Sequence, residues 1–569
     1  MNRAALTTDG SVPPGGGDRS RSASIRIVST SDRAVEAFGV VAVLAVATVL
    51  RAAFLGSPQL FRDEATSWYL ASHSLGDMLR FGAQEPYPPL YLVLLKGWMA
   101  VFGTSEAALR SISVIVGLGV VLVTWRWVRD ALGPLEAWIA SLLVGLSPLL
   151  IANSRNARMY SLETLFATTA WWLIWRLVAG HTERTGRRMA LVAAGVVISV
   201  AGEVWTLSLG IPSAGLQFLF LVVAVVCLRS RSSLIAAASV AIGVLTLVPW
   251  LPNLIAIATN GKPFWTPRPT IEALPTTFKS SFVGQDGGPW ALALILAVVG
   301  LIGLATLLKV GRGRDHEAAI VPEAGAGRWR GRLLALALGL GFGLVPLVWA
   351  YSQLHSIYDG RYLANAFPPF AIAVAAGLAA VGRGLWGRFR SHRIAWAFTM
   401  AALIGLTISA STYTSVHLVA DSSTDAGMDP GRQVAQELAA VVKPGDVVVA
   451  ADAQSFFPLS YYLYETGAAQ RLGITLFDWH APTAAFFTGW ADIDPRQLIE
   501  PATVARLGWR QATGLAPGGS IWVVTLVNAD REQIYFSPLQ LGQLVQLDRI
   551  LVAGNGRIGQ IRRAVPAAP

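Results

Sequence analysis

The chain has 569 residues, of which 53% are hydrophobic and only 14% are charged. A mean hydropathy of +0.51 excludes an ordinary soluble globular protein and is typical of a polytopic membrane protein. The net charge of +11 does not indicate nucleic-acid binding, because the basic residues lie in short loops between apolar runs, the positive-inside pattern. We therefore expect a lipid bilayer as partner and no nucleic acid.

The N-terminal segment, residues 1–33, is rich in Gly, Pro, Ser and Arg and has no hydrophobic periodicity. It is predicted to be a disordered cytoplasmic tail. A cleavable signal peptide is not expected, because the first apolar run starts too far from the N-terminus. The single cysteine, Cys227, lies within an apolar run, so no intramolecular disulfide can form.

Apolar runs of about 18 to 25 residues are long enough to cross a bilayer. Residues 90–102 are interpreted as a surface helix, because a crossing there would place Arg126 and Arg129 outside the cell, against the positive-inside rule. Eleven transmembrane helices then bring the strongly basic loops to the cytoplasmic side and predict a multi-pass plasma-membrane protein with a cytoplasmic N-terminus. These spans are residues 35–55, 107–125, 135–152, 161–178, 189–201, 207–228, 234–251, 289–308, 333–350, 362–381 and 394–413.

The external loop, residues 56–107, follows the first span and is predicted to carry surface helices. It opens on the acidic pair Asp63 and Glu64, and charges beside a bilayer are costly unless they have a function. A turn with the sequence Glu-Pro-Tyr-Pro-Pro-Leu-Tyr follows at residues 85–91, where the prolines fix the chain direction. Ordinary ion pairs of the two carboxylates with Arg62 or Arg110 are the alternative interpretation.

Two further polar segments are predicted at the outer ends of spans. Residues 153–160 contain Arg155 and Arg158, and residues 359–362 contain Arg361. A guanidinium beside lipid suits a phosphate group, with which it forms charge-assisted hydrogen bonds. Snorkelling of arginines at helix ends is the alternative.

The composition changes at residue 421. Apolar runs shorten to strand length, and a helical pattern fills residues 431–442. This alternation predicts a small extracytoplasmic α/β accessory domain over residues 421–569. It contains neither a phosphate-binding glycine loop nor a cluster of metal ligands.

The order of these motifs resembles the GT-C glycosyltransferases, in the branch of protein O-mannosyltransferases and aminoarabinose transferases. The resemblance rests on the acidic pair, Pro-Pro-Leu-Tyr at residues 88–91, Ala-Arg-Met-Tyr-Ser at 157–161, and Arg-Tyr at 361–362 with two prolines after it. It implies a GT-C transmembrane catalytic domain over residues 34–415. Related enzymes often have His or Lys where Tyr87 stands, which puts a basic contact from this position in doubt.

The resemblance implies an inverting enzyme that moves a single sugar, such as mannose or arabinose, from a polyprenyl-phosphate donor. The acceptor would be an extracytoplasmic cell-wall glycan, glycolipid or protein. Asp63 is expected to act as the base that deprotonates the acceptor hydroxyl. Glu64 would be its orienting or acceptor-binding partner.

The remaining candidate residues take the donor phosphate and the substrates. The expected phosphate ligands are Arg158, Arg361, Tyr362 and Arg155. The expected substrate contacts are Glu85, Tyr87, Tyr91, Tyr160 and Trp265. A tryptophan face can stack on a sugar, although membrane-interface packing also accounts for Trp265. No cofactor and no metal site are predicted, with a divalent metal ion as the alternative.

Two other functions fit the composition. A transporter or flippase of polyprenyl lipid or cell-wall precursors would carry ionisable residues near the middle of its spans. A non-catalytic lipid-binding scaffold would need no base. The outer-end position of the polar motifs favours the enzyme.

Overall fold

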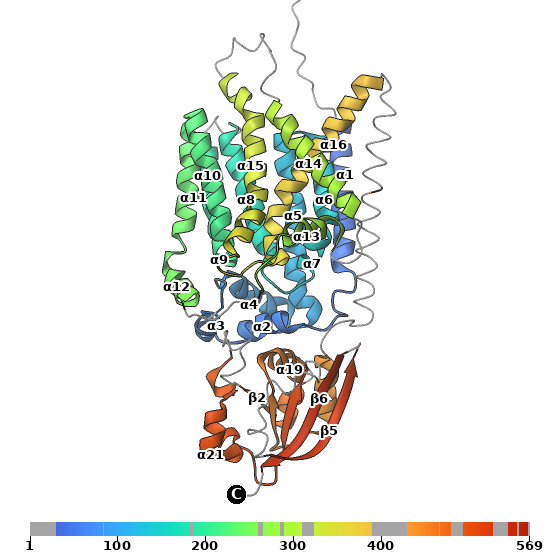
Figure 1. The fold of residues 1–569 in the computed structure, drawn as a ribbon, viewed down its shortest axis with the longest axis vertical. Coiled ribbons are helices and arrows are strands. Elements are labelled where there is room, and N and C mark those ends of the chain that lie inside the picture. The colour runs from blue at the N-terminus through green and yellow to red at the C-terminus, as the bar shows by residue number, and fades with distance from the viewer. Residues whose placement is uncertain are drawn as a thin grey trace, which may run out of the picture.

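The computed structural model describes most of the chain between residues 30 and 566. The described ranges are 30–83, 85–180, 186–259, 266–284, 290–309, 324–389, 405, 430–465, 467–479, 493–526, 544–554 and 557–566. Their helices form a bundle, and a sheet domain packs beyond one end of it (Figure 1). The predicted eleventh span, residues 394–413, lies outside the described residues except for one position.

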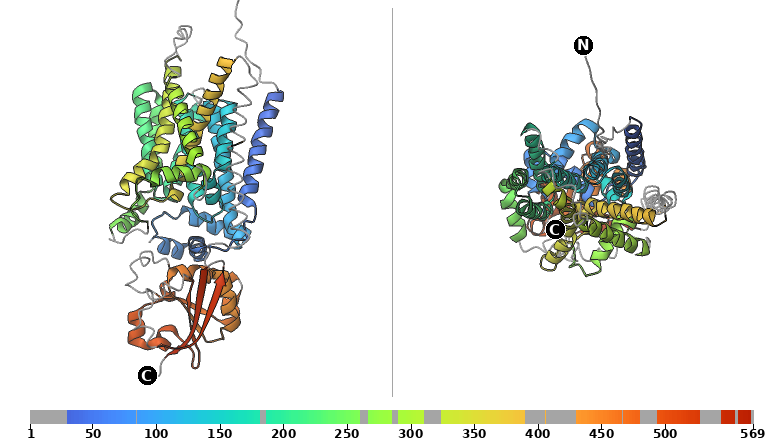
Figure 2. Two further views of the ribbon diagram at one scale, coloured as in Figure 1. Left: turned by 45° about the vertical axis from the view of Figure 1, so that its right-hand side comes forward. Right: turned by 90° about the horizontal axis from the view of Figure 1, so that it is seen from above.

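Long apolar helices build the bundle, and two views show them side by side (Figures 1 and 2). Seven described helices are long and apolar enough to cross a membrane, or eight if one bent pair is counted as a span. The predicted polytopic helical fold is therefore confirmed over the described residues. The bundle helices are α1 (Thr30–Ala52), α5 (Glu106–Ala131), α6 (Pro134–Leu146), α8 (Tyr160–Val178), α9 (Gly186–Thr206), α10 (Gly210–Leu228), α11 (Arg231–Leu245), α14 (Trp290–Lys309), α15 (Ala324–Tyr351) and α16 (Phe367–Phe389).

The predicted third span, residues 135–152, is not one straight helix. Helix α6 ends at Leu146 and α7 (Pro148–Ser154) leaves it at 58°. Pro148 lacks the N–H that would continue the helix, and the Ser147 hydroxyl instead accepts a hydrogen bond from the Leu150 N–H. The buried Arg51 of α1 donates to the Gly145 carbonyl at 2.7 Å and so satisfies a carbonyl that the break leaves open.

Three short helices, α2 (Arg62–Ser72), α3 (Leu75–Gly82) and α4 (Leu90–Phe102), form a layer between the bundle and the sheet domain (Figure 1). The 13 residues of α4 extend only ~20 Å at 1.5 Å per residue, too short for the ~30 Å hydrocarbon core. Four connecting elements complete the helical part: η1 (Val248–Trp250), α12 (Leu251–Thr259), α13 (Ala273–Val283) and η2 (Gly360–Ala366).

The C-terminal part is a mixed α/β domain with a six-stranded sheet of order β3-β2-β1-β4-β6-β5. Strands β1, β2, β3 and β4 run parallel, and β6 pairs antiparallel with both β4 and β5. Its elements are α18 (Gly431–Val441), β1 (Val447–Ala450), α19 (Ala453–Glu465), α20 (Ala468–Leu472), β2 (Thr475–Trp479), η3 (Pro495–Gln497), β3 (Leu498–Ile499), α21 (Pro501–Thr513), β4 (Ile521–Thr525), β5 (Leu544–Gly554) and β6 (Arg557–Pro566).

One hydrophobic core extends from the external helices into the C-terminal domain. It contains Trp68 and Tyr69 of α2 together with Phe456, Phe457 and Tyr461 of α19. The rings of Trp68 and Tyr461 pack edge to face, with their centroids 5.1 Å apart. The sheet domain is thus packed on the external helices through a continuous apolar contact.

Candidate functional site

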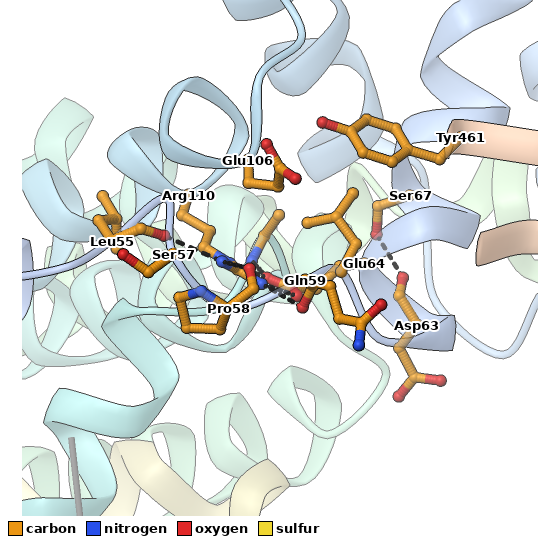
Figure 3. A network of polar contacts seen from close by, with 12 residues as sticks. Leu55, Ser57, Pro58, Gln59, Asp63, Glu64, Ser67, Glu106, Arg110 and Tyr461 are labelled. Atoms are coloured by element: carbon orange, nitrogen blue, oxygen red, sulfur yellow. Dashed lines mark hydrogen bonds and ion pairs between the residues drawn. The ribbon is translucent and has the colours of Figure 1, made fainter. Parts of the chain in front are cut away.

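The acidic pair lies in the first turn of α2, where the helix dipole favours negative charge. Glu64 is fully buried and forms a bidentate ion pair with Arg110 of α5, at 2.8 Å to Nε and 2.6 Å to Nη2. The Ala157 N–H also donates to Glu64, at 2.8 Å. The alternative of a structural ion pair with Arg110 therefore holds for Glu64, which has no surface left for an acceptor. Figure 3 shows the Glu64 and Arg110 side chains within one network of polar contacts.

Asp63 faces the other way. Figure 3 shows its carboxyl group pointing away from Arg110 and from the buried network around Glu64. Its side chain is 28% exposed, and the nearest guanidinium nitrogen is Nη1 of Arg361, at 3.8 Å. Adjacent residues on a helix point about 100° apart, which is why one carboxylate is buried and the other remains accessible.

Arg158 stands behind Asp63, in the short connection between α7 and α8. Its Nη1 donates to the Asp63 carbonyl and to the Ser67 hydroxyl, both at 3.1 Å, and its Nη2 donates to the Tyr87 hydroxyl at 2.6 Å. The guanidinium also lies over the Tyr87 ring, 4.9 Å from its centroid. Arg158 therefore joins α2, where the carboxylate lies, to the predicted Tyr-Pro-Pro turn.

Tyr87 remains a neutral phenol. Burial raises its pKa well above the ordinary value, and the opposing effect of Arg158 does not offset this. Since its oxygen accepts the hydrogen bond from Arg158, its own proton is available to donate to another group. The neighbouring Glu85 is buried in the same turn.

Arg361 approaches from the opposite side, on η2. Asp359 caps this helix by accepting a hydrogen bond from the Arg361 N–H at 2.8 Å, and its carboxylate pairs with the Arg361 guanidinium at 3.1 Å. Asn153 of α7 donates to the Arg361 carbonyl at 3.1 Å. The next residue, Tyr362, is buried and lies 5.6 Å from Tyr160 between ring centroids.

A cavity of about 410 Å³ opens beside these groups, and its lining is almost entirely apolar. Tyr87 and Tyr362 lie at the polar side of its wall, in contact with Arg158 and Arg361 respectively. The remaining lining residues come from the Pro86 turn, the α9–α10 connection, the end of α15 and the segment before η2: Pro86, Leu207, Ser208, Leu209, Ile211, Pro212, Leu347, Val348, Tyr351 and Ile357. An apolar cavity whose wall tyrosines contact two guanidinium groups suits a lipid with an anionic head.

The third predicted phosphate-binding arginine, Arg155, has different partners from Arg158 and Arg361. Arg155 donates to the carbonyls of Arg51 and Ala53, at 3.0 and 2.6 Å, where it caps the end of α1. These two bonds hold a helix end, and the role of Arg155 as a phosphate ligand stays a prediction. Lysine or arginine at a helix C-terminus satisfies open carbonyls in the same manner.

The remaining predicted substrate contacts are either buried or outside the described residues. Tyr91 and Tyr160 are both buried, on α4 and at the start of α8. Trp265 lies outside the described residues. Sequence reasoning missed Ser67, which positions Arg158, and the cavity wall between α9 and α10. The connection between α9 and α10 at residues 207–209 could have indicated this wall. The predicted sixth span instead began at residue 207 and so included the connection.

No group of three or more His, Cys, Asp or Glu side chains in the described ranges is placed to hold a metal ion. Two guanidiniums lie behind the tyrosines of the cavity wall: Arg158 bonds to the Tyr87 hydroxyl, and Arg361 lies over the Tyr362 ring. The accessible Asp63 carboxylate is 3.8 Å from Arg361. A carboxylate can accept a proton, and guanidinium groups can hold an anion.

Comparisons with known proteins agree with this geometry. Residues 86–252 match the model of a family described as dolichyl-phosphate-mannose-protein mannosyltransferase. No curated protein matches the sequence. The predicted resemblance to this family is confirmed by the match.

Solved structures show the fold. The chain is similar to ArnT from Cupriavidus metallidurans in the apo state, with a TM-score of 0.60 and 14% identity over 93% of this chain and 98% of that chain. It is also similar to the same protein bound to undecaprenyl phosphate, with a TM-score of 0.55 and 15% identity over 93% of this chain and 99% of that chain. The predicted GT-C fold with a C-terminal α/β domain is therefore confirmed.

Proposed function

We propose that this chain, a GT-C-fold membrane protein with a mannosyltransferase family match, is an inverting glycosyltransferase. It transfers one sugar from a polyprenyl-phosphate donor to a hydroxyl group outside the cytoplasm. The observation that carries the proposal is the position of the accessible Asp63 carboxylate, 3.8 Å from Arg361. Arg158 bonds to the Asp63 carbonyl and to Tyr87, which lines the apolar cavity.

The donor lipid would lie with its first isoprenoid units in the cavity and its phosphate between Arg158 and Arg361. Burial of the chain against the apolar lining supplies affinity of about 25 cal/mol per Å². The two guanidiniums and the Tyr87 hydroxyl supply charge-assisted and neutral hydrogen bonds to the phosphate oxygens. The similarity in fold to a protein whose structure contains undecaprenyl phosphate supports this choice of lipid class.

In the proposed reaction Asp63 accepts the proton of the acceptor hydroxyl while the acceptor oxygen forms a bond to the anomeric carbon. The bond between that carbon and the donor phosphate oxygen breaks, and its electron pair leaves with the polyprenyl phosphate. Arg158 and Arg361 stabilise the negative charge that accumulates on this leaving group. A single displacement inverts the anomeric configuration.

The proposed domains follow from this assignment. Residues 34–415 carry catalysis, with the external loop at residues 56–107 on the extracytoplasmic face. Residues 1–33 are a cytoplasmic tail, and residues 421–569 form an extracytoplasmic domain. Mannose, arabinose or a similar sugar is the proposed group transferred, and a cell-wall glycan, glycolipid or protein is the proposed acceptor.

A transporter or flippase is less well supported. Such a protein needs ionisable groups near the middle of its spans. The buried carboxylates Glu163 and Glu203 lie instead in the first turn of α8 and the last turn of α9. Both are held by neighbouring amides, Asn365 and Gln217 respectively, as expected of polar groups that bind helices together.

The test is sugar transfer by the purified protein in nanodiscs, with radiolabelled polyprenyl-phosphate mannose and arabinose and a crude envelope acceptor. We expect Asp63→Asn to lower kcat by about 10² to 10⁴, the usual range for loss of a general base. Binding of polyprenyl phosphate should remain within about threefold of wild type, because Asp63 contributes no attraction to an anion.

The control is Asp77→Asn, the same chemical change on α3, where the Asp77 carboxylate accepts a solvent-exposed hydrogen bond from Ser74. It should leave transfer unchanged. Near-normal transfer by Asp63→Asn would remove Asp63 as the base. Binding of polyprenyl phosphate without transfer of any sugar by wild type would favour the scaffold.

A further inference from the structure

The loop before the catalytic helix, residues 55–61, is held from two sides. From the bundle, Arg110 donates to the carbonyls of Leu55, Pro58 and Gln59, at 2.9, 2.7 and 3.0 Å. Figure 3 shows these carbonyls gathered around the Arg110 guanidinium. This contact fixes the loop to α5 but uses only one of its faces.

The other face is held by the C-terminal domain. The Leu60 N–H donates to the Tyr462 hydroxyl of α19 at 2.7 Å. The N–H of Arg432, on α18, donates to Oε1 of Gln59 at 3.0 Å, and the Arg432 guanidinium donates to the Ser57 carbonyl at 3.3 Å. These partners lie about 400 residues apart in the sequence.

The same arginine also reaches the bundle. Nη2 of Arg432 pairs with Glu106 in the first turn of α5 at 2.9 Å. Glu106 and Arg110 are one helical turn apart and lie on one face of α5. Loop 55–61 is therefore enclosed between Arg110 and Arg432, and both are attached to the same helix.

The loop fixes the start of α2. Phe61 is the N-cap, with an extended backbone and no capping side chain, so the helix direction depends on the bonds made by the residues before it. Leu60 and Tyr462 are both buried, at 2% and 3% exposure, and their hydrogen bond is shielded from water. Asp63 follows three residues later, in the first turn.

We propose that Tyr462 and Arg432 of the C-terminal domain are positioning residues for the Asp63 carboxylate, and that the domain is a structural part of the active site. The inference rests on the proposed function, in which Asp63 must lie within hydrogen-bond reach of the acceptor. A displacement of about 1 Å can cost 10²-fold in rate. Burial raises the pKa of Tyr462, which keeps its oxygen a neutral acceptor for the Leu60 N–H.

The chain offers a matched pair of variants. Tyr462→Phe removes the hydroxyl bonded to the Leu60 N–H. Tyr461→Phe removes the neighbouring hydroxyl on the same helix, which donates to the Thr104 carbonyl at 3.0 Å. Both variants keep the ring and lose one contact between domain and external segment, but only Tyr462 touches loop 55–61.

We expect Tyr462→Phe to lower kcat by about tenfold, with KM for the donor and affinity for polyprenyl phosphate within about twofold of wild type. Tyr461→Phe should stay within about twofold in kcat while losing similar thermal stability, since each variant gives up a hydrogen bond to the external segment. Equal kcat losses in the two variants would show a general docking role and overturn the proposal.

Hydrogen exchange of the intact protein in nanodiscs provides a readout that needs no activity. The Leu60 amide should exchange at least about tenfold faster in Tyr462→Phe than in wild type or Tyr461→Phe, because it loses its acceptor. Unchanged exchange would overturn the positioning role even if transfer occurs. Absence of transfer by wild type would instead overturn the proposed function, and the exchange result would still stand by itself.

Discussion

At the scale of single residues, adjacent charges in this protein have opposite surroundings. Glu64 is fully buried against Arg110, whereas the neighbouring Asp63 side chain is 28% exposed beside Arg361. Arg155 caps α1, whereas Arg158, three residues later, reaches the cavity wall through Tyr87. In each pair one member secures the fold and the other is available for chemistry.

The two arginine roles can be separated by binding. Arg361→Met should weaken binding of polyprenyl phosphate by about 10- to 100-fold, because a hydrogen bond to a charged group contributes about 1.5–3 kcal/mol. Arg155→Met should lower the midpoint of thermal unfolding and leave this affinity unchanged. Calorimetric titration in nanodiscs measures both. Loss of affinity in Arg155→Met would instead support Arg155 as a phosphate ligand.

At the scale of elements, the ion pair between Arg110 and Glu64 joins α5 to α2 and is nearly fully buried, with 4% and 0% exposure. Arg110→Met should lower the free energy of unfolding by about 3–5 kcal/mol, because it leaves a buried carboxylate without a counter-charge. Thermal unfolding followed by intrinsic tryptophan fluorescence is the measurement.

The comparison variant is Arg126→Met, which removes an exposed pair with Asp130 on the same helix, at 3.4 Å and 45% exposure of the arginine. Surface pairs contribute at most about 1 kcal/mol, so little change is expected. Similar losses of unfolding free energy in the two variants would mean that burial does not make the Glu64 pair more important for stability.

The sheet domain contains a contrasting carboxylate on β2. Asp478 is 3% exposed, and its Oδ1 has no hydrogen-bond partner among the described residues. Burial and the nearby Asp452 raise the pKa of Asp478 well above its ordinary value, and Arg62 offsets this only in part. The folded protein therefore binds a proton that the unfolded chain releases.

The stability linked to Asp478 is present below the ordinary pKa of about 3.9 and is lost as the pH rises toward the folded value. Asp478→Asn should raise the unfolding midpoint at pH 7 and flatten this dependence between pH 4 and 7. Asp446→Asn should instead cost about 1–3 kcal/mol, because Asp446 accepts hydrogen bonds from the Ser520 N–H and the Trp522 ring. Melting curves across pH test both, and destabilisation by Asp478→Asn would contradict the prediction.

At the scale of the whole molecule, the sheet domain and the external helices lie at one end of the bundle (Figures 1 and 2). The start of α1 and the end of α16 lie at the other end. We expect the first end to be extracytoplasmic. In a Cys227→Ser background, Ser57→Cys should react with a membrane-impermeant thiol reagent in intact cells. Gly186→Cys, at the exposed start of α9, should react only after lysis. The reverse pattern would invert the proposed orientation.

The sequence by itself determined the membrane class, the short surface helix at residues 90–102 and the α/β character of the C-terminal part. These properties depend on local hydrophobicity, length and periodicity, which are written in consecutive residues. The motifs that carry the family resemblance were likewise local, and the order of Asp63, Tyr87, Arg158 and Arg361 along the chain predicted a polar site at the outer ends of the spans.

Only the tertiary structure decided which of these residues face one another. The partner that buries Glu64 comes from 46 residues away, and the bond that orients the start of α2 comes from 402 residues away. The bend after Leu146 and the apolar cavity also arise between elements, not within one. Burial and pairing depend on such distant contacts, so no local pattern could show that Glu64 is buried against Arg110 while Asp63 stays accessible.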